Sequence, residues 1–289
     1  MSRVPGPDDT RGIVDPVFMR TIVSLERYEP GEALDGLVDW FWAVSYRLPE
    51  GMEHEQRVLT HPGSNLSVGT VDRAGRVMLP AGARVYGPVR RLDARRLVGE
   101  GWTVAAKTSG GLGALTDRSA HTLVDAEVPM DVALGLPDAG SGGAARVAAA
   151  VAAAGSEPDR VGTLRSLLES VVERRPAALL AAAREVTAVA AFAEHDRGVV
   201  RVEQLAAHAG VGVRTLQRMF AQHLGVSPAW VVRRWRIIEA AERAAAGEAV
   251  GWAALAAELG YADQAHLGRD FRAHLGVPPA TYQRSLTTV

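Results

Sequence analysis

The sequence has no cysteine, a single lysine (Lys107) and few aromatic residues, which make up 6% of its 289 positions. The absence of cysteine excludes disulfides, thiolate metal sites and a thiol switch. No segment approaches the roughly 18 uninterrupted apolar residues of a membrane-spanning helix, and the N-terminus has no apolar signal core. We therefore expect a soluble protein of the cytoplasm, with no membrane partner.

The two signs of charge are nearly balanced over the whole chain, whose formal net charge is −1. Along the sequence, however, the balance is uneven. From Arg197 to the C-terminus there are 11 arginines and four histidines against seven acidic residues, so the preceding part is acidic. A mildly basic C-terminal part on an acidic chain favours local contact with nucleic acid over a general affinity for polyanions.

Composition and periodicity predict an α+β chain made of successive parts. Residues 17–136 contain short β-type runs separated by glycine and proline, as in a β-sandwich or barrel. Residues 137–160 are rich in glycine and predict a flexible connection with a brief alanine-rich helix inside it. A linker helix is expected over 161–176 and an all-α domain over 177–289. The polar residues 1–16 are expected to be disordered.

The expected linker helix has an apolar stripe, which could either form a dimer seam or pack on the β-rich part. Its members are Leu164, Leu167, Leu168, Val171 and Val172. The sequence leaves both arrangements open, so a homodimer stays among the candidate assemblies.

The helical part contains two copies of one pattern, offset by 50 to 51 residues. The positions that recur are Leu216, Arg218 and Phe220, matched by Leu267, Arg269 and Phe271, and the segment 223–229, matched by 274–280. Each copy predicts a short helix, a turn containing Gly210 or Gly260, and a second helix. This is the pattern of a helix-turn-helix, and two copies predict a protein that contacts two neighbouring major grooves of double-stranded DNA.

The second helix of each copy has an apolar face and a face that can contact DNA. In the first copy, Leu216 and Phe220 lie on the apolar face at helical spacing. Arginine and glutamine on the opposite face can form the bidentate hydrogen bonds that distinguish guanine and adenine. Two copies in register favour this interpretation over a merely solvated helix face. The candidate DNA-binding residues are Arg214, Thr215, Gln217 and Arg218 in the first copy, and Gln264, Ala265, His266, Arg269 and Arg272 in the second.

A long helix is predicted between the two copies. It begins with Ser227 as N-cap and Pro228 in the first turn, and it ends at Gly247. At 1.5 Å per residue it spans roughly 27 Å, near the ~34 Å between successive major-groove faces. Its basic cluster at 233–236 has two open interpretations, contact with DNA phosphates or ion pairs with glutamates of the same helix.

These residues resemble the DNA-binding domain of AraC/XylS-type bacterial transcription regulators. The resemblance covers about residues 180–286 and is carried by the doubled motif and by the turns Gly225–Pro228 and Gly276–Pro279. It implies two recognition helices, joined by a long helix, that enter adjacent major grooves on one face of the DNA. It also implies RNA polymerase as a partner if the protein is an activator. Gly268 should weaken the second recognition helix by up to ~1 kcal/mol.

The N-terminal part is similar to the cupin-like sensor region of a subset of these regulators. The segments that carry this similarity are 25–30, 40–42, 61–62 and 85–88. It implies that this part binds a small-molecule effector, forms a dimer, or both. Trp40 and Trp42 should share one face of a strand and Phe41 the other, although such aromatic residues can also be simply core. The candidate effector-binding residues are Trp40, Trp42, His61, Tyr86 and Trp102.

No catalytic residue, cofactor or metal site is expected. His54, Glu55 and His61 are the nearest set of metal-ligating residues, but they lack the paired His-x-His spacing of catalytic cupins. His223 and His274 are equivalent in the repeat and are expected to pack beside the turns. The absence of cysteine separates the chain from methyl-accepting DNA-repair relatives, whose chemistry consumes a thiolate.

The expected function is that of a sequence-specific DNA-binding transcription regulator, not an enzyme, whose N-terminal part responds to an effector. One alternative is a constitutive DNA-binding regulator whose N-terminal part only assembles subunits. Another is a cupin-type enzyme with the DNA-binding domain as a tether.

Overall fold

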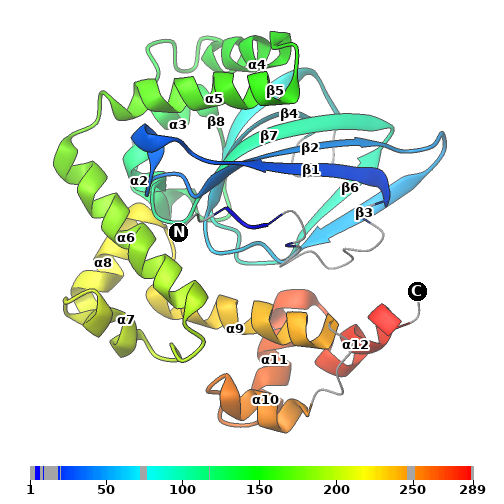
Figure 1. The fold of residues 1–289 in the computed structure, drawn as a ribbon, viewed down its shortest axis with the longest axis vertical. Helices are drawn as coiled ribbons and strands as arrows, with labels where there is room; N and C mark the ends of the chain where they lie inside the picture. The colour runs from blue at the N-terminus through cyan, green and yellow to red at the C-terminus, as the bar shows by residue number, and fades with distance from the viewer. Residues whose placement is uncertain are drawn as a thin grey trace.

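The computed structural model describes residues 4–6, 9, 19, 21–71, 77–116, 118–245 and 251–287. Strands form the N-terminal part and helices the C-terminal part, as the sequence predicts (Figure 1). The helix end expected at Gly247 and most of residues 1–16 lie outside the described residues. Of the helices that are described, none combines the length and the apolar character needed to cross a bilayer.

Two antiparallel sheets form the N-terminal part. Its strands are β1 (Val23–Tyr28), β2 (Trp40–Arg47), β3 (Glu53–Val58), β4 (Ser64–Val71), β5 (Val77–Tyr86), β6 (Asp93–Val98), β7 (Glu100–Thr108) and β8 (Glu127–Pro129). One sheet has the order β1-β2-β7-β4-β5-β8, and the other pairs β3 with β6 (Figure 1). The β-rich N-terminal part is therefore confirmed as two sheets.

The two faces of the six-stranded sheet have different neighbours. Phe41 is fully buried, and the guanidinium of Arg165 lies 5.2 Å from its ring centroid, so Phe41 faces the helices. Trp42 points to the other face, where its Nε1 donates to Asn65 Oδ1 at 3.0 Å. Because side chains alternate along a strand, Trp40 shares the face of Trp42, as predicted. We call this face, opposite the helices, the inner face.

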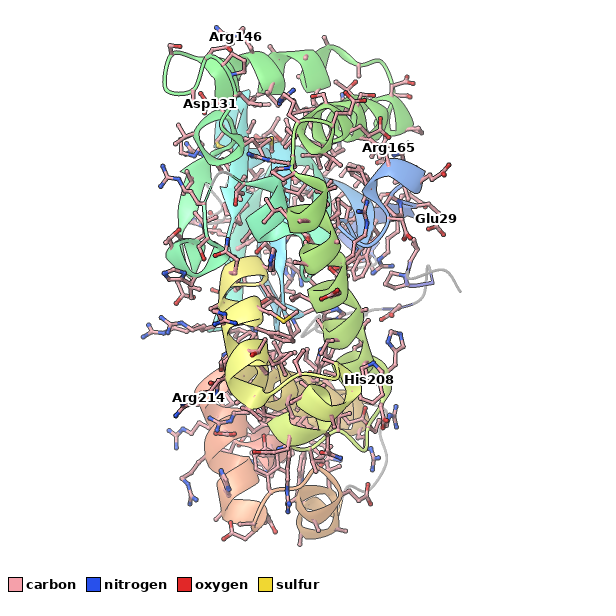
Figure 2. All side chains as sticks on the ribbon, turned by 90° about the vertical axis from the view of Figure 1, so that its left-hand side faces the viewer. Glu29, Asp131, Arg146, Arg165, His208 and Arg214 are labelled. Carbon is pink, nitrogen blue, oxygen red and sulfur yellow. The ribbon has the colours of Figure 1, made fainter. Side chains whose placement is uncertain are left out.

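Short helices and two longer ones complete the N-terminal part. They are η1 (Glu32–Leu34), α2 (Leu112–Leu115), η2 (Ala120–Leu123), α3 (Met130–Leu134), α4 (Gly143–Ala153) and α5 (Glu157–Val172). Figure 1 shows α4 and α5 lying across the six-stranded sheet. Arg165 of α5 donates from Nη2 to the carbonyl of Glu29 at 2.9 Å, which ties the helix to the end of β1 (Figure 2).

Residues 137–160, expected to form a flexible connection, instead lead into the core of the N-terminal part. Ala148 and Val151 of α4 are buried in the same apolar cluster as the sheet residues Leu66 and Val104. The high glycine content of this segment led to the prediction of flexibility. At Gly143 a Cβ atom would lie 2.7 Å from the Cβ of Asp131, so glycine permits close packing of α4 rather than a flexible linker.

The apolar stripe of the expected linker helix, 161–176, also packs on the sheet. Leu164 and Leu168 of α5 are fully buried in the cluster that contains Phe41. Of the two arrangements that the sequence left open, the structure shows packing on the β-rich part, so this stripe is not free to form a dimer seam.

The C-terminal part is made of seven helices within the described residues. They are α6 (Ala177–His195), α7 (Val202–His208), α8 (Val213–His223), α9 (Pro228–Ala245), α10 (Trp252–Glu258), α11 (Gln264–Leu275) and α12 (Pro279–Thr287). Helix α6 connects the two parts, since Leu180 and Ala183 belong to the N-terminal core whereas Val186 and Val189 belong to the cluster around α8.

Candidate nucleic-acid interface

The first helix-turn-helix is formed by α7 and α8, and we call α8 the first reader. Gly210 lies between them with φ at 64°, a left-handed conformation that favours glycine and ends α7. Leu205 of α7 packs with Leu216 and Phe220 of α8 in one apolar cluster, and all three are fully buried. The predicted apolar face of the first reader is confirmed.

The second helix-turn-helix is formed by α10 and α11, and we call α11 the second reader. Gly260 has φ at 72° in the turn, as its counterpart does in the first copy. Asp263 caps α11, because its Oδ1 accepts a hydrogen bond from the backbone N–H of His266 at 2.7 Å. Leu267 and Phe271 are fully buried. The repeat in the sequence is therefore a repeat in structure.

The opposite face of each reader carries polar side chains. The exposed ones are Arg214, Gln217 and Arg218 in the first reader, and Gln264, Arg269 and Arg272 in the second. Within the described residues, none of these six side chains makes an internal hydrogen bond or ion pair. Arg214 lies at the side of the helical part in Figure 2. The structure thus leaves these groups available to a partner.

Three further candidates differ in exposure. Ala265 is exposed at the start of the second reader, and Thr215 is half-buried in the first. His266 is also half-buried, and its ring meets the ring of Tyr261 edge-on with centroids 5.1 Å apart. Part of the His266 ring is therefore engaged in packing the turn.

The two readers present different chemistry at equivalent positions. Applying the offset of the repeat, Arg218 matches Arg269, whereas Arg214 matches Ala265 and Gln217 matches Gly268. Arg218 and Arg269 are thus the one exposed arginine position that the two readers share. If both helices contact base edges, the two half-sites that they read should differ in sequence.

Helix α9 joins the readers and begins as predicted, because Ser227 Oγ accepts from the backbone N–H of Trp230 at 3.2 Å. Its basic cluster makes contacts that neither of the two interpretations included. Arg234 is fully buried and contacts the N-terminal part, and Arg233 Nε lies 3.4 Å from Oδ2 of Asp270 in the second reader. Glu239 is paired instead with Arg243 of its own helix, at 3.0 Å.

His223 and His274 are both buried at the ends of their readers, as predicted. Burial lowers the pKa of each imidazole, because the charged form would be poorly solvated there. In the case of His274 the backbone carbonyl of Asp270, 2.8 Å from Nδ1, partly opposes this effect. Both histidines are thus packing residues that disfavour protonation.

The structure places three of the five candidate effector-binding residues on one face of the six-stranded sheet. Trp40, Trp42 and Tyr86 share the inner face, since Tyr86 pairs in register with Asn65. His61 lies outside the strands and lines a small cavity with Trp40 and Lys107. Trp102 is on the opposite face of the sheet.

Trp102 lies on the face of the sheet that carries α4 and α5. The guanidinium of Arg160, from α5, is 4.3 Å from the Trp102 ring centroid. Together they line an open groove of about 800 Å³ on the outside of the sheet. The structure therefore separates Trp102 from the other four candidates. Side chains alternate along β7, and Lys107 and Trp102 are an odd number of positions apart, so they point to opposite faces of the sheet.

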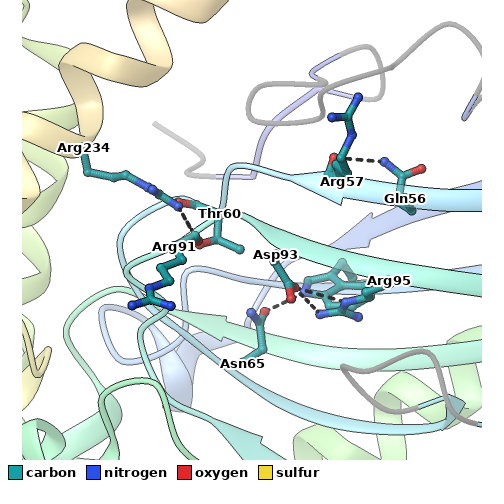
Figure 3. Close-up of polar contacts among 9 residues, drawn as sticks. Gln56, Arg57, Thr60, Asn65, Arg91, Asp93, Arg95 and Arg234 are labelled. Carbon is teal, nitrogen blue, oxygen red and sulfur yellow. Dashed lines mark hydrogen bonds and ion pairs between the residues drawn. The ribbon is translucent and has the colours of Figure 1, made fainter. Parts of the chain in front are cut away.

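Residues that the sequence prediction did not select add polar groups opposite the inner face. Asp93 and Arg95 of β6 form an ion pair, with Nη2 3.1 Å from Oδ2, and the Asp93 side chain is almost completely buried. Figure 3 shows this pair beside Asn65. The local sequence around Asp93 and Arg95 gives no signal of this placement, because only the pairing of β3 with β6 brings the two residues opposite the inner face.

Lys107 occupies the junction between the two parts of the chain. Its Nζ donates to the carbonyl of Pro62 at 2.9 Å and lies 3.7 Å from Asp39 Oδ2, with both side chains buried. Burial lowers the pKa of this amine, and the nearby Asp39 opposes the effect. Lys107 could have been singled out from the sequence, because it is the single lysine in a chain that otherwise uses arginine.

The described cavity at the junction is too small for an effector. The rings of His61 and Trp235 approach with centroids 4.8 Å apart. The cavity beside them, which Lys107 also lines, measures about 10 Å³, room for one water at most. Across the described ranges, no three histidine, aspartate or glutamate side chains gather as metal ligands would.

Comparisons with known proteins find one family match in each part of the chain. A family model described as a helix-turn-helix domain matches residues 205–285, and one for a domain of unknown function, DUF6597, matches residues 26–129. Curated protein sequences give no match. A search of solved structures finds similarity to ToxT from Vibrio cholerae.

The 1.65 Å resolution structure of ToxT has 11% identity and a TM-score of 0.40, over 86% of this chain and 99% of that chain. Unsaturated fatty acid-bound ToxT from strain SCE256 has 10% identity and a TM-score of 0.37, over 86% and 96%.

Proposed function

Because the chain carries a helix-turn-helix DNA-binding domain of the AraC type at residues 205–285, we propose that it regulates transcription by placing both readers in adjacent major grooves of one operator. The observation that carries this proposal is the doubled motif. Each reader is held by a buried apolar face and presents an exposed polar face with no internal partner among the described residues.

The roles of the readers follow from the geometry of hydrogen bonding. Arg218 and Arg269 occupy equivalent exposed positions and suit bidentate contact with guanine, whereas Gln217 suits adenine. Arg214 adds a second cation to the first reader, and Arg272 adds one to the second. The other candidates, Thr215, Gln264, Ala265 and His266, lie beside them and would complete the base or phosphate contacts.

Selection of duplexes from a random DNA pool by the full chain, followed by footprinting, tests this function. We expect two protected segments, on one face of the duplex and about one helical turn apart. The affinity should fall by about 0.9 log units per neutralised phosphate for each tenfold rise in salt. Failure to enrich any duplex, or an affinity independent of salt, would contradict DNA binding.

The N-terminal part is proposed to bind a small-molecule effector at the inner face. The side chains that support this are Trp42 and Tyr86, with the polar groups of Asn65, Asp93 and Arg95 beside them. Of the other two candidates, Trp40 and His61 line the small junction cavity and would form only the edge of this site. Aromatic surface with a few polar groups suits a ligand that has an apolar body and at least one hydrogen-bonding substituent. In a thermal-shift screen, such a ligand at 100 times its Kd should add ~2.7 kcal/mol to the free energy of unfolding.

A constitutive regulator is the second candidate. It would show no thermal shift with any metabolite, and removal of residues 17–176 would abolish a dimer seen in sedimentation. We also propose that the protein acts in the bacterial cytoplasm and forms homodimers. If it is an activator, it contacts RNA polymerase as well. An enzymatic role is not part of it.

A further inference from the structure

The loop between β3 and β4, residues 59–63, inserts into the helical part of the molecule. Leu59 is 1% exposed and belongs to the apolar cluster formed by α9, α10, α11 and α12, which includes Ile237, Leu267 and Phe271. A residue of the N-terminal part thus completes the core that holds the second reader. We call residues 59–63 the wedge loop.

Arg234 of α9 is bound by the wedge loop. Its Nε donates to the carbonyl of Thr60 at 2.9 Å, and its Nη2 lies 3.1 Å from Thr60 Oγ1 and 3.5 Å from the carbonyl of Arg91 (Figure 3). The Trp230 ring centroid lies 5.5 Å from its guanidinium. These contacts fix the guanidinium, and therefore this turn of α9, against the N-terminal part.

The burial of Arg234 is not explained by stability. The side chain is fully buried, and the described residues give it no carboxylate partner. Burial lowers its pKa to about 10, which shows that the charged form is poorly solvated. A buried cation held only by neutral acceptors costs free energy that an apolar side chain of similar size would not. Its hydrogen bonds instead define one orientation of α9.

The neighbours of Arg234 on α9 connect the wedge loop to the second reader and, through the packing of Trp235, to the apolar cluster behind the first reader. Arg233 pairs with Asp270 of the second reader, and Trp235 contacts His61 of the wedge loop. The first reader is fixed as well, because a Cβ atom on Gly225, at its end, would lie 2.7 Å from the carbonyl of Ala120. The N-terminal part therefore touches the end of one reader, the connecting helix, and the core behind the other.

From these contacts we infer that the wedge loop sets the relative position of the two readers, with Arg234 as a positioning residue that does not touch DNA. This inference rests on the proposed function, since it needs both readers to bind one operator. It deepens that function by assigning the preferred spacing of half-sites to a contact between the two parts of the chain. The hydrogen bond from Lys107 to Pro62 links this contact to the sheet.

The test uses the full chain and a duplex that the parent protein selects from a random pool. A second duplex has the half-sites moved apart by about five base pairs, half a helical turn, and a third has only the half-site of the first reader. Binding is measured for the parent, for Arg234→Met and for Thr60→Val. Arg91→Ala is the matched control, because it removes a nearby arginine side chain but keeps the backbone carbonyl that Arg234 contacts.

We expect the parent and Arg91→Ala to prefer the original spacing by at least about tenfold, equivalent to ~1.4 kcal/mol. Arg234→Met should reduce this preference to threefold or less. Thr60→Val, which removes only the Oγ1 contact and keeps the Thr60 carbonyl, should reduce it by a smaller but measurable factor. Both variants should leave binding to the single half-site unchanged. A merely structural role would weaken binding to all three duplexes equally, and this result would overturn the inference. An unchanged spacing preference in Thr60→Val would overturn it even if Arg234→Met failed to fold. If the parent selects no duplex, the proposed function itself fails.

Discussion

Phe220 and Phe271 occupy the same place in the two readers, and neither has any exposed surface. Phe220 belongs to the apolar cluster between α6, α7, α8 and α9, whereas Phe271 belongs to the cluster that also contains Leu59. The ring of Phe271 contacts the rings of Trp252 and Tyr282 edge-on, with centroids 5.9 and 5.6 Å away. The repeat therefore anchors each reader by one phenylalanine in its own core.

We expect Phe220→Ala and Phe271→Ala each to lower the free energy of unfolding by about 3–5 kcal/mol, because each leaves a cavity in a packed core. Chemical denaturation followed by circular dichroism measures the change. The DNA affinity should fall with the loss of folded protein. An unchanged midpoint for either variant would show that its ring is not needed to hold the reader.

Replacement of the shared arginine should weaken DNA binding without loss of fold. Arg218→Ala and Arg269→Ala should each cost roughly 1–3 kcal/mol of specific binding if each arginine pairs with a guanine. The measurement is a titration of the selected duplex at fixed salt. Arg47→Ala is the control of equal charge change, since Arg47 is exposed on β2 and paired with Glu100. Footprints equal to that of the parent in both reader variants would contradict the assignment of the readers.

Gly268 gives a test in the opposite direction. A Cβ atom at this position of α11 meets nothing within 4 Å, so Gly268→Ala should stabilise the second reader by about 0.5–1 kcal/mol through its higher helix propensity. Gly276→Ala is the matched contrast, because Gly276 ends the helix with φ at 80° and alanine there should destabilise by ~1 kcal/mol. Thermal melting of both variants measures these changes, and equal shifts in Tm would contradict this account.

Acidification should destabilise the helical part through its two buried histidines. The folded-state pKa values of His223 and His274 are lowered by burial, whereas the unfolded chain titrates near its ordinary value of about 6.5. Below that pH the unfolded state takes up protons first, so stability is full above about pH 6.5 and decreases as the pH falls toward the folded-state values. The double variant His223→Gln, His274→Gln should lose part of this dependence in melts between about pH 7.5 and 5.5. A dependence identical to that of the parent would exclude the two imidazoles as its source.

The isolated segment 177–289 should fold and bind DNA, but with lower stability than the helical part has in the full chain. Its clusters lose Leu59 and Val124, which come from the N-terminal part, and Arg234 loses its acceptors. Circular dichroism melts of the segment and of the full chain measure the difference. Identical midpoints would show that the N-terminal part adds nothing to the cores behind the readers.

Local sequence determined the two helix-turn-helix motifs. The spacing of Leu216 and Phe220 needs only the helical period, and the turns need only a glycine able to adopt positive φ at residues 210 and 260. Such signals lie within about one motif length, so they could be recognised without knowing what packs against them. The alternation of Trp40 and Trp42 on one face of a strand was predictable for the same reason.

Only the tertiary structure decided which long-range partners each segment finds. The glycine-rich residues 137–160 contribute to a core because the open face of a sheet formed by other segments receives α4 and the start of α5. Arg234 appeared to be one of several surface arginines until the wedge loop, 174 positions earlier in the sequence, was seen to bury it. Local periodicity fixes which face of a helix is apolar, but the burial of a charge depends on acceptors that distant segments bring to it.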